Sequence, residues 1–206
     1  LAILAVAFGN GRMLGNDDDH SDPLPPRQTS PFWPQPQSYT LGSTPLVLST
    51  TFRFKQDSSQ KSSLLERAID RYHAIYAGYR AKMSKTGKPT TAQSINFCDV
   101  DVTNVLSNPA AEKASLTLDV DESYTISVAS AGACTITAST VWGAIHGLES
   151  FTQLLERNSA QGVGQINMPY APVSVTDSAR FTHRGILIDS ARHFLPVQTI
   201  KRMIDT

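Results

Sequence analysis

The chain has 206 residues, of which 40% are hydrophobic, and its 18 basic side chains balance 18 acidic ones. These proportions are typical of a globular protein with one domain and room for the beginning of a second. Zero net charge without a local cluster of Lys and Arg excludes the usual electrostatic basis of nucleic-acid binding. No apolar run approaches the roughly 20 residues of a membrane-spanning helix, so we expect neither a nucleic-acid partner nor a membrane span.

The chain begins with a short apolar block. Residues 1–9 have the length and the small side chains of the apolar core of a secretory signal peptide. A buried strand or helix is the alternative, but a polar stretch rich in Asn, Asp and Pro follows from Asn10. We therefore interpret residues 1–30 as the remnant of a signal peptide and a polar linker, which favours a secreted protein.

The first regular elements are a strand and a helix. Apolar and polar side chains alternate over residues 46–54, as they do in a half-buried strand. Apolar residues then recur at steps of three and four from Leu64 to Tyr79, which predicts an amphipathic helix of four to five turns. Ser62 or Ser63 is placed to cap its first turn.

Three further strands are predicted, at residues 95–102, 124–128 and 134–138. In the last two, apolar residues again occupy every second position, and a short connection rich in Ala, Ser and Gly joins them. This arrangement is typical of an antiparallel hairpin with one apolar face.

A second helix is predicted directly after the hairpin, with Ser139 or Thr140 as its N-cap. Gly143 and Gly147 form a strip of small residues on it, which usually lets a helix lie close to a sheet. Residues 31–178 are therefore expected to form an α+β domain, in which an antiparallel sheet carries two helices on one face.

The character of the sequence changes near its C-terminal end. Residues 159–180 resemble a loop, with one short strand at 164–167. Residues 184–190 contain a continuous apolar run, typical of a strand buried on both faces, and Pro196 then opens a predicted helix. The order of strand and helix indicates the first βα unit of a parallel α/β domain at residues 179–206.

The chain has two cysteines, Cys98 and Cys134, and both lie in predicted strands. If these strands are neighbours in the sheet, one disulfide could form, worth about 3 to 4 kcal/mol in the chain-entropy model. Two separate buried thiols are an equally good interpretation. The five histidines are scattered without the spacing of a metal site, and we expect neither a metal nor a cofactor.

Three aromatic residues could either pack in the core or stack on a sugar. Trp142 and Phe151 follow helical spacing, which favours the core over a sugar-stacking role. Trp33 is the better candidate for stacking on a sugar, although anchoring the first segment of the domain is the more ordinary role.

Four segments together resemble β-N-acetylhexosaminidases of glycoside hydrolase family 20. They are WPQPQ at 33–37, ESYTI at 122–126, TVWGAIHGLESFTQL at 140–154 and FTHRGILIDSARHFLP at 181–196. The last two are specific, and the resemblance covers about residues 31–206.

The resemblance implies a non-catalytic α+β domain followed by a (β/α)₈ TIM barrel. Such enzymes remove terminal non-reducing N-acetyl-β-D-hexosamine, GlcNAc or GalNAc, by substrate-assisted retaining catalysis, in which the substrate's acetamido oxygen attacks the anomeric carbon. One carboxylate orients the acetamide and a neighbouring Glu protonates the leaving oxygen. This Asp-Glu pair belongs to a later barrel strand, so no catalytic residue is expected among the 206 residues.

By the same resemblance, Arg192 stands at the C-terminal end of the first barrel strand and binds hydroxyls of the terminal sugar. A guanidinium presents several fixed donors to neighbouring hydroxyls, which a Lys point charge does not. The alternative is a purely structural ion pair between Arg192 and Asp189. Asp189 is expected to be a structural or supporting acid and not a catalyst.

The resemblance also implies partners, location and a departure from the family. Oligosaccharides and glycoconjugates ending in N-acetylhexosamine are the expected partners, with a possible homodimer through the barrel, in a secreted or lysosomal/vacuolar protein. Animal lysosomal members carry a cysteine before the first helix as the partner of Cys134, but Ser62 and Ser63 occupy that stretch here. Cys134 must therefore pair with Cys98 if it forms a bridge. The competing hypothesis is a structural or carbohydrate-associated domain without activity.

Overall fold

The computed structural model describes residues 30–56, 61–81, 92–105, 115–157 and 165–205. Residues 1–29, which hold most of the predicted signal-like block and linker, lie outside the described residues. The chain divides into two compact units, with the boundary between Arg180 and Phe181. In chain order the elements are β1 (Ser38–Gln56), α1 (Ser63–Ala81), β2 (Ser94–Val102), β3 (Tyr124–Val128), β4 (Cys134–Ala138), α3 (Val141–Gln153), β5 (Glu156–Arg157), β6 (Ile166–Asp177) and α4 (Val197–Asp205).

The strands of the first unit form one six-stranded sheet in the order β1-β2-β4-β3-β6-β5, and β1 also pairs with β6. The predicted α+β class is confirmed, but the prediction of an antiparallel sheet is wrong, because β2 is parallel to both β1 and β4. The remaining pairs are antiparallel, including the predicted hairpin of β3 and β4. Helix α1 joins β1 to β2 and returns the chain to the end of the sheet where β1 began, so the two strands run in the same direction.

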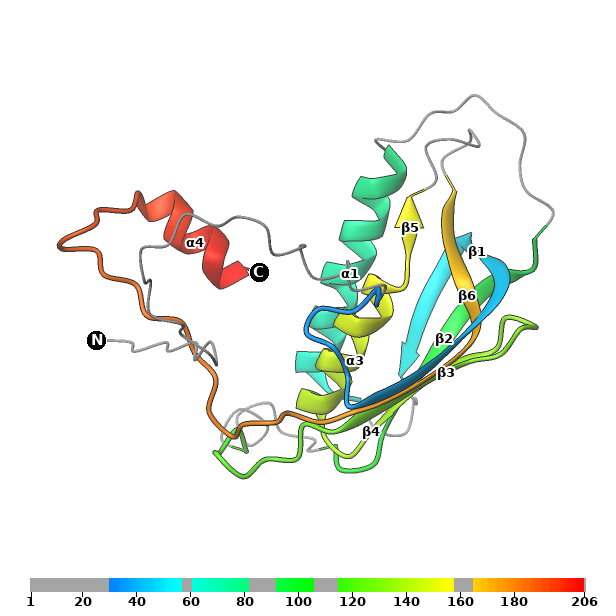
Figure 1. The fold of residues 1–206 in the computed structure, drawn as a ribbon, viewed down its shortest axis with the longest axis horizontal. Helices are drawn as coiled ribbons and strands as arrows, with labels where there is room; N and C mark the ends of the chain where they lie inside the picture. Colours follow the sequence, from blue (N-terminus) through cyan, green and yellow to red (C-terminus); the bar gives the residue numbers. More distant parts are fainter. Residues whose placement is uncertain (1–29, 57–60, 82–91, 106–114, 158–164, 206) are drawn as a thin grey trace, which may run out of the picture. The chain divides into compact units, whose positions relative to one another are not determined.

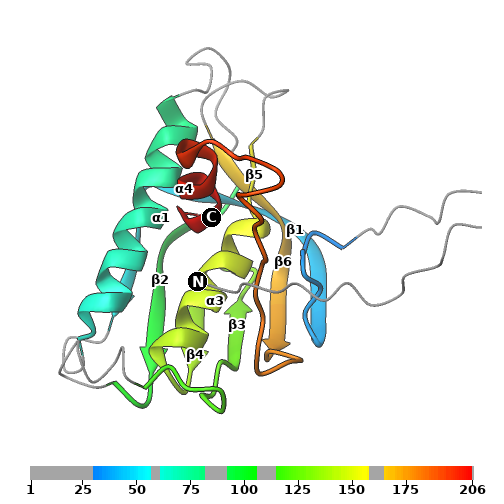
Figure 2. The same ribbon diagram turned by 90° about the vertical axis from the view of Figure 1, so that its left-hand side faces the viewer.

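Helices α1 and α3 lie on the same face of the sheet, as predicted (Figures 1 and 2). Both predicted caps are present: Ser62 Oγ accepts from the Leu65 N–H at 3.1 Å, and Thr140 Oγ1 accepts from the Gly143 N–H at 3.3 Å. The inward side of α1 follows helical spacing, so it buries one apolar stripe against the sheet and α3. Its members are Leu65, Ala68, Ile69, Tyr72 and Tyr76.

Aromatic rings fill the space between β1 and the helices. Phe52 and Phe54 lie two residues apart on β1, and both contact Phe151 of α3. The ring centroid of Phe151 is 5.8 Å from that of Phe52 and 5.4 Å from that of Phe54. Phe151 is thus a core residue, as predicted. Trp142 is only half-buried, and its indole Nε1 donates to Ser115 Oγ at 3.3 Å. Indole combines an apolar body with one polar donor, which suits this position at the margin of the core.

Strand β6 is the largest difference from the sequence prediction of a short strand at residues 164–167. It has 12 residues and pairs with β1, β3 and β5. Pro172 argues against a strand in the sequence, because proline has no N–H to donate to a neighbouring strand. In the structure Pro172 lies opposite a bulge of β1, between the pairs Leu41 with Val173 and Thr44 with Ala171. A Cβ on Gly42 within that bulge would lie 2.3 Å from the Ala171 carbonyl oxygen, so glycine is required there.

The second unit contains α4, which begins after Pro196 as predicted. The strand predicted at residues 184–190 is wrong, because those residues adopt no strand. A parallel strand is stabilised by hydrogen bonds to neighbouring strands, and none of the described residues pairs with this segment. Leu187 is accordingly 67% exposed. Across the described residues, no helix has both the length and the apolar character needed to cross a bilayer.

Candidate functional site

The candidate sugar-binding residue Arg192 lies in a tight turn organised by Asp189. One carboxylate oxygen, Oδ1, accepts from the backbone N–H groups of Ala191 at 3.0 Å and Arg192 at 3.1 Å. The other, Oδ2, accepts from Arg192 Nε at 2.6 Å. These bonds hold the pKa of Asp189 below its usual value. The backbone N–H of Arg192 contributes most to this lowering, and the backbone N–H of Ala191 comes next. Asp189 is therefore ionised at neutral and mildly acidic pH.

The ion pair leaves most of the guanidinium available. Only Nε of Arg192 is engaged, and its terminal Nη groups make no hydrogen bond with the described part of the chain. The side chain is 87% exposed. Since a guanidinium has five N–H donors in a planar fork, contact with Asp189 fixes its direction while four donors remain for neighbouring hydroxyls. The structural and the sugar-binding interpretations of Arg192 are thus compatible.

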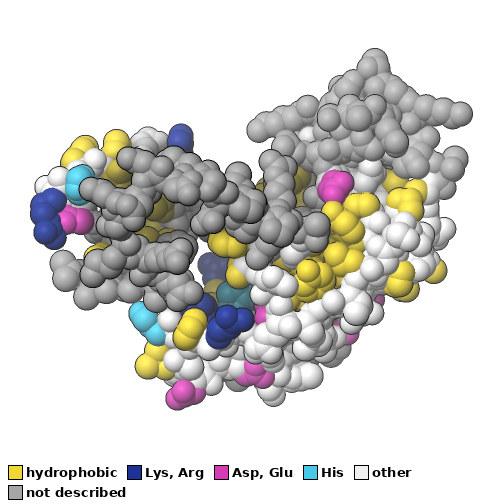
Figure 3. All heavy atoms as spheres, in the orientation of Figure 1, with side chains coloured by type: hydrophobic (Ala, Val, Ile, Leu, Met, Phe, Trp, Pro, Cys, Tyr) yellow, Lys and Arg dark blue, Asp and Glu magenta, His cyan; other side chains and the backbone are white. Residues whose placement is uncertain are grey.

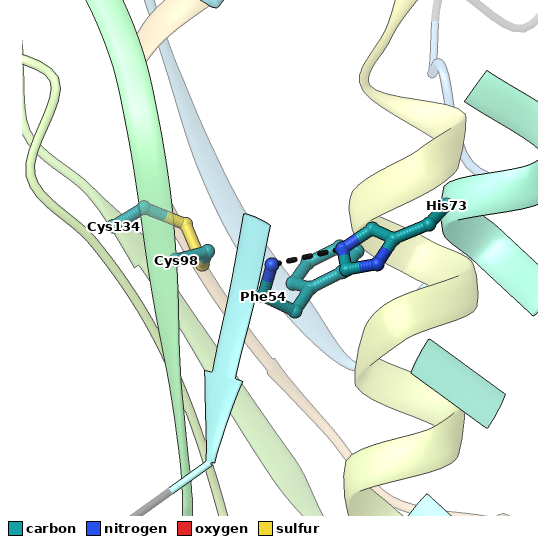
Figure 4. The surroundings of a disulfide bond; sticks show 4 residues. All are labelled: Phe54, His73, Cys98 and Cys134. Atoms are coloured by element: carbon teal, nitrogen blue, oxygen red, sulfur yellow. Dashed lines mark hydrogen bonds between the residues drawn. A yellow bond between two sulfur atoms is a disulfide. The ribbon is translucent and has the colours of Figure 1, made fainter. Parts of the chain in front are cut away.

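Cys98 and Cys134 form a disulfide between β2 and β4, with their Cα atoms 4.5 Å apart (Figure 4). The bond joins neighbouring parallel strands, next to the registered pair Asp99 and Thr135. Both sulfur-bearing residues are buried in the apolar core. Of the two interpretations of the cysteines, the structure therefore has the disulfide and not two separate buried thiols.

The aromatic anchor of the first segment is Phe32, so the interpretation of Trp33 as that anchor is wrong. Phe32 is 3% exposed and packs edge-on against Tyr39, whereas Trp33 is 76% exposed. The Trp33 backbone is nevertheless held: its N–H donates to Gln153 Oε1 at 2.8 Å, and its carbonyl accepts from Gln153 Nε2 at 2.9 Å. Sequence reasoning missed Gln153 because its partner lies far away in the chain.

Charged side chains on the face shown in Figure 3 stand in small, separate groups. Among the described residues, Asp189 forms an ion pair with Arg192, and Glu122 contacts the His146 ring at 3.2 Å. Lys55 Nζ also lies 3.4 Å from the centre of the Phe97 ring. Each is a local contact, in keeping with the balanced charge of the sequence.

Both units match models of known families. Residues 32–154 match a family described as beta-acetyl hexosaminidase like, and residues 181–206 match the catalytic domain of glycosyl hydrolase family 20. This chain belongs to glycoside hydrolase family 20. The segment that carries Asp189 and Arg192 therefore lies within the part that matches the family's catalytic domain.

Named relatives and solved structures agree with this assignment. The chain is 32% identical to Beta-hexosaminidase 1 of Arabidopsis thaliana over 90% of its own length, and 37% identical to Beta-hexosaminidase subunit beta of Felis catus over 84%. These matches cover 35% and 32% of the two relatives, so the chain spans about a third of their length.

Among solved structures, the chain resembles the chitobiase of Flavobacterium johnsoniae with a TM-score of 0.60 and 26% identity, over 84% of the chain and 24% of that protein. It also resembles the N-acetyl-beta-hexosaminidase of Streptomyces plicatus with a TM-score of 0.53 and 25% identity, over 91% of the chain and 34% of that protein. The likeness extends over most of this chain and therefore includes its α+β domain.

Proposed function

We propose that this chain is part of a β-N-acetylhexosaminidase that hydrolyses terminal non-reducing N-acetyl-β-D-hexosamine, GlcNAc or GalNAc, from oligosaccharides and glycoconjugates. Arg192 carries this proposal. It lies in the segment that matches the catalytic domain, and Asp189 holds it through Nε so that its remaining donors can reach a ligand. Vicinal sugar hydroxyls are suitable acceptors for such a planar fork.

In the proposed mechanism Arg192 positions the terminal sugar and takes no part in proton transfer. The acetamido oxygen of the substrate attacks the anomeric carbon while a Glu protonates the leaving oxygen, and a second carboxylate orients the acetamide. Hydrogen bonds from Arg192 keep the sugar ring in place for this attack. Because binding energy that fixes geometry also lowers the reaction barrier, loss of the fork affects both affinity and turnover.

Residues 179–206 form, in this proposal, the beginning of a (β/α)₈ barrel. Several large apolar side chains of this segment are exposed, which supports a larger surrounding domain because exposed apolar clusters usually mark an interface. The remainder of such a barrel would cover these side chains. They include Phe181, Leu187, Phe194 and Val197.

We expect Arg192→Lys, in the full-length protein, to lower kcat/KM for an aryl N-acetyl-β-D-glucosaminide by about 10- to 100-fold. Hydrogen bonds from a charged donor contribute roughly 1.5 to 3 kcal/mol each, and Lys cannot form the planar fork. Steady-state kinetics measure the loss, and far-ultraviolet circular dichroism checks the fold. The matched control is Arg180→Lys, since Arg180 is exposed and precedes the matched segment. Unchanged kinetics for Arg192→Lys would refute the role, and an inactive full-length wild type would refute the proposed enzyme.

We further propose that the protein is secreted or resides in a lysosome or vacuole. The Cys98–Cys134 disulfide supports this location because cytosolic thiols are kept reduced. Alkylation of the protein as isolated from its source, followed by mass spectrometry, should find both cysteines unmodified until a reductant is added. Free thiols at both positions would contradict the proposed location.

A further inference from the structure

One edge of β1 is closed by side chains of α1 in place of another strand. Among the described residues, strand β1 pairs with β6 only as far as Leu48, and beyond it only with β2. Arg80 donates to the Thr50 carbonyl at 3.2 Å and also to the Ser49 carbonyl. The Phe54 N–H donates to His73 Nε2 at 3.1 Å (Figure 4). An open strand edge is a template for pairing with other chains, and α1 covers this one.

The contact between Phe54 and His73 requires a neutral imidazole. Nε2 can accept the Phe54 N–H only while it carries no proton, so the ring proton resides on Nδ1. The same imidazole stacks on the Phe54 ring, with centroids 5.8 Å apart and planes inclined by 14°. His73 is thus positioned by two independent contacts with one residue of β1. In the protonated ring both nitrogens are donors, and Nε2–H would face the Phe54 N–H.

The charges around His73 come from its own helix, α1, and from β1, which it contacts. Partial burial lowers its pKa most, and Arg53 of β1 and Arg80 of α1 lower it further, while Asp70 of α1 opposes them. A folded-state pKa below the unfolded value of about 6.5 means that the unfolded chain binds more protons. The stabilisation by His73 is therefore complete above about pH 6.5 and is lost as pH falls through the folded-state pKa.

We propose that His73 is a pH-sensitive clasp, whose neutral ring closes the open edge of β1 and whose protonation in an acidic medium releases the Phe54 N–H. The clasp joins the middle of α1 to the end of β1, so its opening frees the edge of β1 at Phe54, while Arg80 still holds the Ser49 and Thr50 carbonyls. Its role is independent of Arg192 and of the proposed hydrolysis.

Nuclear magnetic resonance of the ¹⁵N-labelled 206-residue chain tests this proposal. At pH 7.5 the imidazole nitrogen shifts of His73 should show the Nδ1–H tautomer. The protection of the Phe54 amide against hydrogen exchange, corrected for the intrinsic rate, should fall at least tenfold with the midpoint of the His73 titration. The amide of Ile126, whose strand β3 is paired on both edges, should keep its protection over the same range.

Two variants sharpen the test. His73→Gln supplies an acceptor that does not titrate, so Phe54 protection should become independent of pH. His146→Gln, at an exposed histidine of α3, should leave the wild-type pH dependence intact. An Nε2–H tautomer at pH 7.5, or constant Phe54 protection while His73 titrates, would overturn the proposal. Both observations come from the wild-type chain, so the result stands even if His73→Gln does not fold.

Discussion

The double substitution Cys98→Ala and Cys134→Ala is expected to lower the free energy of unfolding by about 4 kcal/mol. The two cysteines are 36 residues apart, and in the chain-entropy model a bridge of this length restricts the unfolded chain by roughly that amount. The folded state keeps the apolar surroundings of both positions, because alanine adds no polar group to the buried site. Urea titration of the chain, followed by circular dichroism, measures the change.

Reduction of the wild-type chain is the matched control for this prediction. A reductant strong enough to open the buried bridge should bring the wild type to within about 1 kcal/mol of the double variant, since both then lack the same cross-link. The variant itself should not respond to reductant. A double variant as stable as the oxidised wild type would show that the bridge adds little to the pairing of β2 with β4.

Gly143→Ala is expected to cost about 2 to 3 kcal/mol, although alanine favours a helix over glycine by about 1 kcal/mol. A Cβ at this position would lie 2.3 Å from the Ser123 carbonyl oxygen and 3.1 Å from the Glu122 carbonyl carbon. Both are backbone atoms, so α3 must move away from the segment before β3. Thermal and urea unfolding of the chain measure the loss.

Gly78→Ala is the control because it makes the same chemical change in helix α1. Apart from its chain neighbours and the backbone of its own helix, no heavy atom of the described residues lies within 4 Å of a Cβ built at Gly78. Only the helix preference should therefore act, with a gain of about 0.5 to 1 kcal/mol. The two glycines should therefore shift stability in opposite directions. Equal effects at Gly78 and Gly143 would contradict the close approach of α3 as the reason for glycine.

The local elements were predictable because their signals lie within a few residues. Alternation of apolar side chains locates β3 and β4, and Thr140 marks the start of α3 through a bond to the Gly143 N–H. Strand β6 was not predictable in this way. Pro172 resembles a strand breaker until Gly42, distant in sequence, provides the bulge opposite it.

The parallel pairing of β2 also escapes local patterns. Strand direction depends on where α1 returns the chain, and a period of two is the same in either direction. At residues 184–190 the opposite error occurs: the local pattern predicts a strand that the structure does not contain. Its apolar run has the composition of a buried strand, but a strand exists only with partners for its backbone groups.

The sequence by itself determined the family, the α+β class, the hairpin, the helix caps and the choice of Arg192 as the candidate sugar-binding residue. These follow from contiguous motifs and short periods. Only the tertiary structure decided that Cys98 and Cys134 are bonded, that Asp189 engages the guanidinium of Arg192 through Nε alone, and that His73 accepts from the backbone of β1. Each depends on the distance and direction between groups, which packing sets and residue type alone does not.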